Sequence, residues 1–127
     1  MTTKQESLSG MSNVYWSRKI GNNTFRFSSA SCIEGIRLHQ TTVVCFLDHK
    51  KTKVQIDNGG WETSTTKNRI NRYANEGNHN FYQLLLQQKN YEWIVTLVAP
   101  VNSGKDDIVL NFIPGMSIDL VHGISTL

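Results

Sequence analysis

The sequence predicts an α+β domain in which antiparallel β-hairpins form one sheet and a single central helix, over about 64–76, packs on it. Three observations predict this class. Short runs of alternating or β-branched apolar residues recur along the chain, turn residues separate these runs, and only one segment has helical periodicity. The chain of 127 residues has room for one compact domain.

Two strand-like runs near the N-terminus, 14–20 and 24–28, flank the turn residues 21–23. The second run alternates aromatic and polar residues with the period of a half-buried strand. We therefore expect a first hairpin here. The apolar residues of 29–40 fit neither the strand period nor the helix period, so this segment is expected to be a loop or a short strand.

The clearest hairpin joins 41–47 to 52–57. The first run is apolar on both faces, which is typical of a central strand, whereas the second alternates and is expected to have one wet face. The sequence Asn-Gly-Gly at 58–60 then predicts a tight turn before Trp61, because glycine tolerates a positive φ.

The helix of 64–76 is predicted from its ends and its period. Ser64 or Thr65 offers an N-cap oxygen, and Gly77 offers a residue that can end the helix in the left-handed conformation. One side of the helix is polar and basic, and the other is expected to pack on the sheet. The residues of this packed side are Thr66, Ile70, Tyr73 and Ala74.

After the helix, the runs 81–87 and 91–98 predict a second strong hairpin around a turn at 88–90. A further strand is expected over 108–113. The tail from Met116 alternates loosely, so packing, pairing as an edge strand and fraying all stay open.

The chain divides into a compact module over 41–127 and an N-terminal arm and hairpin over 1–40, which are expected to be an addition to it. Cys32 and Cys45 belong to no C-x-x-C pair, so we expect both to be packed, reduced thiols. The sequence shows neither the apolar core of a signal peptide nor an apolar run long enough for a membrane span. We therefore expect an intracellular protein without membrane contact.

Enzyme chemistry is the least favoured class. The sequence offers no nucleophile beside a base, no phosphate-loop motif and no cluster of His, Cys, Asp or Glu at metal-ligand spacing. The four histidines are isolated from one another. We expect no catalytic residue, no metal site and no cofactor.

The modest net charge is concentrated between His49 and Arg72, where six basic residues face two acidic ones. Backbone N–H groups at the helix start form a reasonable anion site, Trp61 offers a stacking surface for a base, and basic side chains offer phosphate contacts. A purely structural interpretation of the same residues is helix capping, core packing of Trp61 and Tyr73, and an Arg72–Glu76 surface pair. The predicted phosphate-binding residues are Trp61, Thr65, Thr66, Lys67, Arg69 and Arg72, with Lys50, Lys51 and Lys53.

The segment 54–71 resembles a pattern found in small bacteriophage proteins, G-G-[WY]-x-T-x-T-T-K-x-R-[IM]-N. The segments 87–93 and 112–116 look like the rest of that module, so the resemblance covers about 41–118. It implies a viral or mobile-element setting in the host cytoplasm and no particular activity. The residues that fit the pattern are Gly59, Gly60, Trp61, Thr63, Thr65, Thr66, Lys67, Arg69, Ile70 and Asn71.

The leading hypothesis is a non-catalytic phage accessory protein whose basic helix and Gly-Gly-Trp turn bind a phosphate-bearing partner, nucleic acid above all. A second hypothesis is a protein-interaction module, such as an inhibitor of a host enzyme or defence factor. A third is a structural component of the virion. The oligomeric state stays open. The second hypothesis uses the aromatic residues of the first hairpin, Tyr15, Trp16, Phe25 and Phe27.

Overall fold

The structure is a computed structural model that describes residues 13–77 and 80–126. The α+β class with one helix on antiparallel strands is confirmed, with the difference that the strands divide between two sheets rather than one. The elements along these residues are β1 (Val14–Gly21), β2 (Thr24–Ser29), β3 (Cys32–Leu38), β4 (Thr41–Phe46), β5 (Lys53–Ile56), α1 (Ser64–Tyr73), β6 (Gln83–Lys89), β7 (Glu92–Val98), β8 (Ile108–Asn111), β9 (Met116–Asp119) and β10 (Ile124–Thr126).

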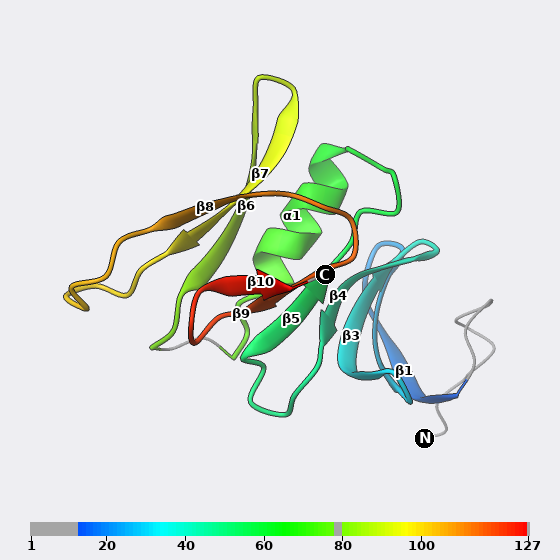
Figure 1. Ribbon diagram of the computed structural model, residues 1–127. Helices are drawn as coiled ribbons and strands as arrows, with labels where there is room; N and C mark the ends of the chain where they lie inside the picture. The colour runs from blue at the N-terminus through cyan, green and yellow to red at the C-terminus, as the bar shows by residue number, and fades with distance from the viewer. Residues whose placement is uncertain (1–12, 78–79, 127) are drawn as a thin grey trace.

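The larger sheet has seven strands in the order β1-β2-β3-β4-β5-β9-β10, and the smaller has three in the order β6-β7-β8. The helix contacts β3 and β4 of the larger sheet and β6 of the smaller one. Figure 1 shows α1 beside the β6–β7 hairpin, which extends well beyond the body of the molecule. The main core fills the space between the helix and the two sheets.

The predicted hairpins of the N-terminal half are confirmed as β1–β2 and β4–β5. For 29–40, where a loop or a short strand is expected, the strand is correct: Cys32–Leu38 forms β3 between β2 and β4. Four consecutive residues at the end of β3 are buried, including Arg37. Burial on both faces removes the alternation that identifies a strand in a sequence. As predicted, β4 is an interior strand.

The helix is shorter than predicted, because it ends at Tyr73 rather than near residue 76. Its N-cap is Thr63, whose hydroxyl accepts a hydrogen bond from the Thr66 backbone N–H, and not Ser64 or Thr65. Gly77 does not provide a left-handed stop, since it is not among the glycines with a positive φ. A Cβ atom at Gly77 would lie 2.5 Å from the carbonyl oxygen of Lys50, so glycine allows this close approach to the β4–β5 turn.

The packed side of the helix is confirmed: Thr66, Ile70, Tyr73 and Ala74 are all buried. The second strong hairpin is also confirmed as β6–β7, with its turn at Asn90 and Tyr91 instead of 88–90. The tail pairs inside the larger sheet, because β9 lies between β5 and β10. Ile118 and Leu120 of this tail are buried in the main core.

Cys32 and Cys45 form a disulfide, which corrects the prediction of reduced thiols. Their Cα atoms are 5.5 Å apart, a usual distance for a disulfide. The prediction that both are packed is confirmed, because they form a small second core with Val14 and Phe27. The sequence separation of thirteen residues does not indicate this disulfide. The antiparallel pairing of β3 with β4 brings the two cysteines close to each other.

The larger sheet runs without interruption across residue 40, because β3 pairs with β4 from Glu34 to Leu38. The division into 1–40 and 41–127 therefore stays a prediction from sequence. Within the described residues, no helix is long and apolar enough to cross a membrane.

Candidate functional site

The turn before the helix is the first part of the candidate site. Asn58 and Trp61 close it with a backbone hydrogen bond of 2.8 Å between the Trp61 N–H and the Asn58 carbonyl. Gly59 and Gly60 both have a positive φ, of 61° and 85°, as the two central residues of a type I′ turn do. A side chain at Gly59 would collide with the side chain of Thr41, so the turn also needs glycine to pack on β4.

The helix start is the second part. The Thr66 N–H is bonded to the Thr63 hydroxyl and the Lys67 N–H to the Thr63 carbonyl. This corrects the predicted anion site, which used the N–H groups of 65–67. Within the described chain, the helix N–H groups that donate to no protein acceptor are those of Ser64 and Thr65. The first turn has no acidic residue, so its partial positive charge is not offset there.

A hollow of about 480 Å³ opens between this helix start and the β3–β4 turn. Among the described residues that line it, none is Asp, Glu, Lys or Arg. Trp61 is 65% exposed beside it, which corrects the structural interpretation that placed this ring in the core. We call this feature the Trp61 hollow; its lining residues are Leu38, His39, Gln40, Thr41, Val43, Asn58, Trp61, Thr63, Thr65 and Thr66.

The structure brings together three of the predicted site residues, Trp61, Thr65 and Thr66, and separates the lysines from them. Lys50 and Lys51 lie in the β4–β5 turn, which packs against Gly77 beyond the opposite end of the helix. Lys53 is exposed on β5. The helix rises about 1.5 Å per residue, so roughly 15 Å of helix separates these lysines from the Trp61 hollow. The positive segment of the sequence is not one positive patch in space.

The basic residues of the helix point in two directions. Asn71, one turn after Lys67 on the same side of the helix, bonds to the backbone of Leu86 on β6. Lys67 therefore lies on the β6 side. Arg69 donates from Nε to the Thr24 hydroxyl at 3.0 Å, so it lies on the β2 side. Of the predicted cations, Lys67 is the one in the first turn of the helix, but it is not among the residues that line the Trp61 hollow.

Lys51 is neutralised in a four-charge cluster of Arg26, Glu34, Lys51 and Glu76. Its Nζ lies 3.2 Å from a carboxylate oxygen of Glu34 and 3.2 Å from one of Glu76. Arg26 bonds to the same two carboxylates. The predicted Arg72–Glu76 pair is replaced by these bonds, because Glu76 lies beyond the end of the helix and faces β2 and the β4–β5 turn.

Arg72 instead lies over the ring of Tyr73, with its Cζ 5.3 Å from the ring centroid. Arg26 approaches the same ring, at 5.6 Å. Arg18 is the cross-strand neighbour of Arg26 on β1. Sequence reasoning missed Arg18 and Arg26, because the hairpin that carries them is far from the helix along the chain.

The sequence matches the family described as Kyanoviridae Gp96 protein over residues 3–119. The chain belongs to this family. Because this is a phage protein family, the resemblance to small bacteriophage proteins is confirmed. The match to the Gp96 family includes most of 1–40 as well as the helix and the Trp61 hollow. Searches of curated proteins and of solved structures found no match.

In this Gp96-family chain, the aromatic residues of the alternative protein-interaction site do not form one surface. Tyr15 is 64% exposed, Trp16 and Phe25 are half-buried, and Phe27 is fully buried in the second core. Phe27 therefore cannot contact a partner. Across residues 13–77 and 80–126, no group of three or more His, Cys, Asp or Glu side chains is placed to hold a metal ion.

Proposed function

We propose that this phage protein is a non-catalytic accessory protein that binds nucleic acid at the Trp61 hollow. A base stacks on Trp61 and enters the hollow, and the adjoining phosphate lies at the start of α1. The observation that carries the proposal is the position of Trp61, a large apolar ring that is 65% exposed beside a hollow of about 480 Å³.

The lining of the hollow suits a base. Leu38 and Val43 offer an apolar floor, and the threonine hydroxyls and the Gln40 amide offer hydrogen-bond partners for the edge of a ring. Stacking of a base on an aromatic side chain contributes about 1–3 kcal/mol and accepts any base. The absence of Asp and Glu among the described lining residues removes a source of repulsion for a phosphate.

The phosphate would be bound by groups that have no other partner in the described part of the chain. These are the backbone N–H groups of Ser64 and Thr65. The ammonium of Lys67, in the same turn of the helix, would add positive charge from the β6 side. A helix start supplies both directed N–H donors and partial positive charge. This arrangement supports binding of the proposed ligand without Lys50, Lys51 or Lys53.

Replacing Trp61 tests the proposal. We expect Trp61→Ala to weaken binding of a labelled single-stranded oligonucleotide about tenfold or more, because the stacking free energy is lost. Fluorescence anisotropy at several salt concentrations measures both the affinity and its salt dependence. Tyr91→Ala is the matched control, since Tyr91 is an aromatic residue 92% exposed at the tip of the β6–β7 hairpin, outside the hollow. No binding by the wild type to single-stranded DNA or RNA at low salt, or equal losses in the two variants, would overturn the proposal.

A protein partner remains the second candidate, supported by the exposure of Tyr15 on the edge strand β1. A pull-down from infected cells with and without nuclease distinguishes a protein partner from a nucleic-acid partner. Capture that survives nuclease and is lost in Tyr15→Ala favours a protein partner, whereas capture that nuclease abolishes favours nucleic acid.

A further inference from the structure

We propose that the ligand is a single strand of several nucleotides that continues from the Trp61 hollow to a second phosphate contact, formed by Arg18, Arg69 and Arg72. We call these three residues the arginine track. The inference rests on the proposed function and adds the class of ligand and the second contact.

The arginine track lies next to two cations, Arg26 and Lys51, whose charges are already neutralised. Arg26 and Lys51 share the carboxylates of Glu34 and Glu76, so this four-charge cluster has no net charge. The Arg26 guanidinium is held in place by those carboxylates and by the ring of Tyr73. The cluster therefore cannot offset the charge of neighbouring arginines.

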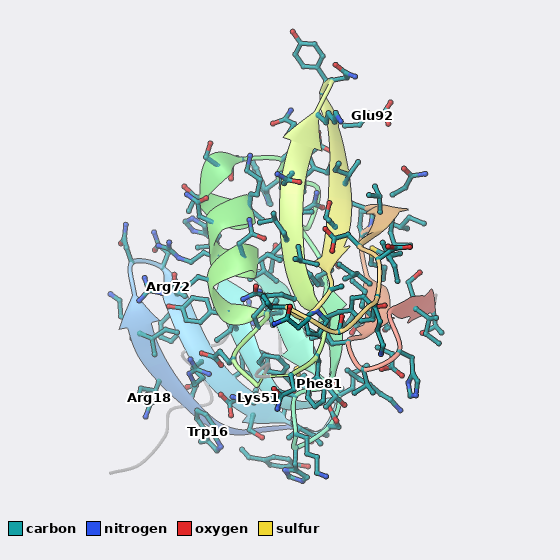
Figure 2. The ribbon with its side chains drawn as sticks, turned by 90° about the vertical axis from the view of Figure 1, so that its left-hand side faces the viewer. Trp16, Arg18, Lys51, Arg72, Phe81 and Glu92 are labelled. Carbon is teal, nitrogen blue, oxygen red and sulfur yellow. A yellow bond between two sulfur atoms is a disulfide. The ribbon has the colours of Figure 1, made fainter. Side chains whose placement is uncertain are left out.

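Each arginine of the track lies against this cluster or its neighbour Thr24. Arg18 is directly opposite Arg26 on β1, Arg72 shares the Tyr73 ring with Arg26, and Arg69 bonds to Thr24 through Nε. Figure 2 shows Arg18, Arg72 and Lys51 on one side of the molecule. The track thus bridges the β1–β2 hairpin and the helix, with the cluster between them.

Within the part of the chain that the structure describes, the three arginines have no carboxylate partner. Among the described residues, no Asp or Glu oxygen lies within salt-bridge distance of Arg18, Arg69 or Arg72. Arg26, directly opposite Arg18, already has the carboxylates of Glu34 and Glu76, so the charge of Arg18 is the one that these carboxylates do not offset. A guanidinium binds a phosphate through two parallel N–H donors. A phosphate is therefore the group that this surface lacks.

The distance between the two contacts decides the class of ligand. From Ser64 to Arg72 the helix rises roughly 12 Å, so one phosphate cannot reach both the helix start and Arg72. A chain of several nucleotides spans this distance. A base that enters the hollow has to leave its stack, which single strands allow at low cost. Both points favour a single strand over a mononucleotide or a duplex.

The test compares a dinucleotide with a twelve-nucleotide single strand of the same base. Dinucleotide binding is followed by tryptophan fluorescence in a Trp16→Phe/Trp93→Phe background, in which Trp61 is the remaining tryptophan. Binding of the longer strand is followed by anisotropy. In Arg18→Gln/Arg72→Gln, we expect the affinity for the longer strand to fall at least tenfold at low salt and the salt slope to fall by about 1.4, which is two single-strand phosphates. The affinity for the dinucleotide is expected to stay unchanged.

Lys89→Gln/Lys105→Gln is the matched control, since it removes two exposed cations from the smaller sheet and the loop after β7. The inference is wrong if this control loses as much affinity as the arginine variant, if the arginine variant keeps the wild-type salt slope, or if it weakens both ligands equally. It is also wrong if a blunt duplex binds as tightly as the single strand. Failure of the dinucleotide to quench Trp61 at millimolar concentration overturns the Trp61 hollow itself. So does unchanged binding of the dinucleotide to Trp61→Ala, measured by competition with the labelled longer strand.

Discussion

Asn71→Asp is expected to lower the free energy of unfolding by about 3 kcal/mol, because it breaks a two-bond contact between the helix and the backbone of β6. The Asn71 amide donates to the Leu86 carbonyl at 2.9 Å and accepts from the Leu86 N–H at 2.6 Å. An aspartate retains the second bond but places a carboxylate oxygen against the Leu86 carbonyl. Asn71→Ala is expected to cost about 2 kcal/mol, since it loses both bonds without adding a charge.

A second asparagine, Asn75, follows Asn71 by four residues and contacts the same strand. Asn75 makes the same pair of bonds to Leu84, at 2.8 and 2.7 Å. Leu84 and Leu86 are two strand residues apart, a rise of about 6.8 Å. Asn71 in the last turn of the helix and Asn75, two residues past its end, therefore match successive outward-facing groups of β6. The helix thereby satisfies an edge strand that would otherwise be open to pairing with another chain.

Urea denaturation monitored by circular dichroism measures this effect. Asn68→Asp is the matched control, because Asn68 is an exposed asparagine on the same helix, and it is expected to change stability by less than about 0.5 kcal/mol. Equal losses in Asn71→Asp and Asn68→Asp would contradict a structural role for the Asn71 bonds.

The helix motif shows how far sequence reasoning reaches. Its hydrophobic period predicted the buried side correctly through Ile70 and Tyr73. Asn71, however, fits the same motif as Lys67 and Arg69 and has a structural role that no periodicity reveals. The reason is physical: side-chain bonds to a strand edge depend on which strand lies beside the helix, and the sequence does not state that.

The lysines show the complementary limit. Because many basic residues lie close together in the sequence, one basic surface was predicted. In the structure, however, Lys51 pairs with Glu34 and Glu76. Those two carboxylates lie 17 and 25 positions away from Lys51. A net charge that is summed over the residues near Lys51 in the sequence therefore leaves them out. Trp61 was predicted both as a core residue and as a site residue, and only its exposure in the fold decides between these interpretations.

Glu76→Gln is expected to lower the free energy of unfolding by about 2 kcal/mol at pH 7. Breaking a fully buried ion pair costs about 3–5 kcal/mol, and the smaller figure reflects the partial exposure of Arg26, 14%, and Glu76, 24%. The loss leaves Arg26 and Lys51 with Glu34 as their remaining carboxylate in the cluster. The variant also loosens the contact between β2 and the segment after the helix, because Arg26 makes two of its bonds to Glu76.

The pH dependence of this loss follows from the direction of the pKa shift. Burial works to raise the pKa of the Glu76 carboxyl, but the hydrogen bonds and charges of Arg26 and Lys51 outweigh it and hold that pKa below its usual value of 4.5. A carboxyl with a lowered pKa in the folded state stabilises the fold above its unfolded pKa, and this contribution disappears as the pH falls through the folded pKa. The stability difference between the wild type and Glu76→Gln is therefore expected to be full at pH 7 and to shrink below about pH 4.

Asp48 and Asp119 also have lowered pKa values, so the acid sensitivity of the wild type alone does not isolate Glu76. The difference in the free energy of unfolding between the wild type and Glu76→Gln isolates the contribution of Glu76, because both proteins contain those aspartates. Urea denaturation at pH 7 and pH 3 gives this difference, with Glu62→Gln as the exposed control. A stability difference of the same size at both pH values would show that Glu76 acts through packing and not through its charge, and would contradict the four-charge cluster as a source of stability.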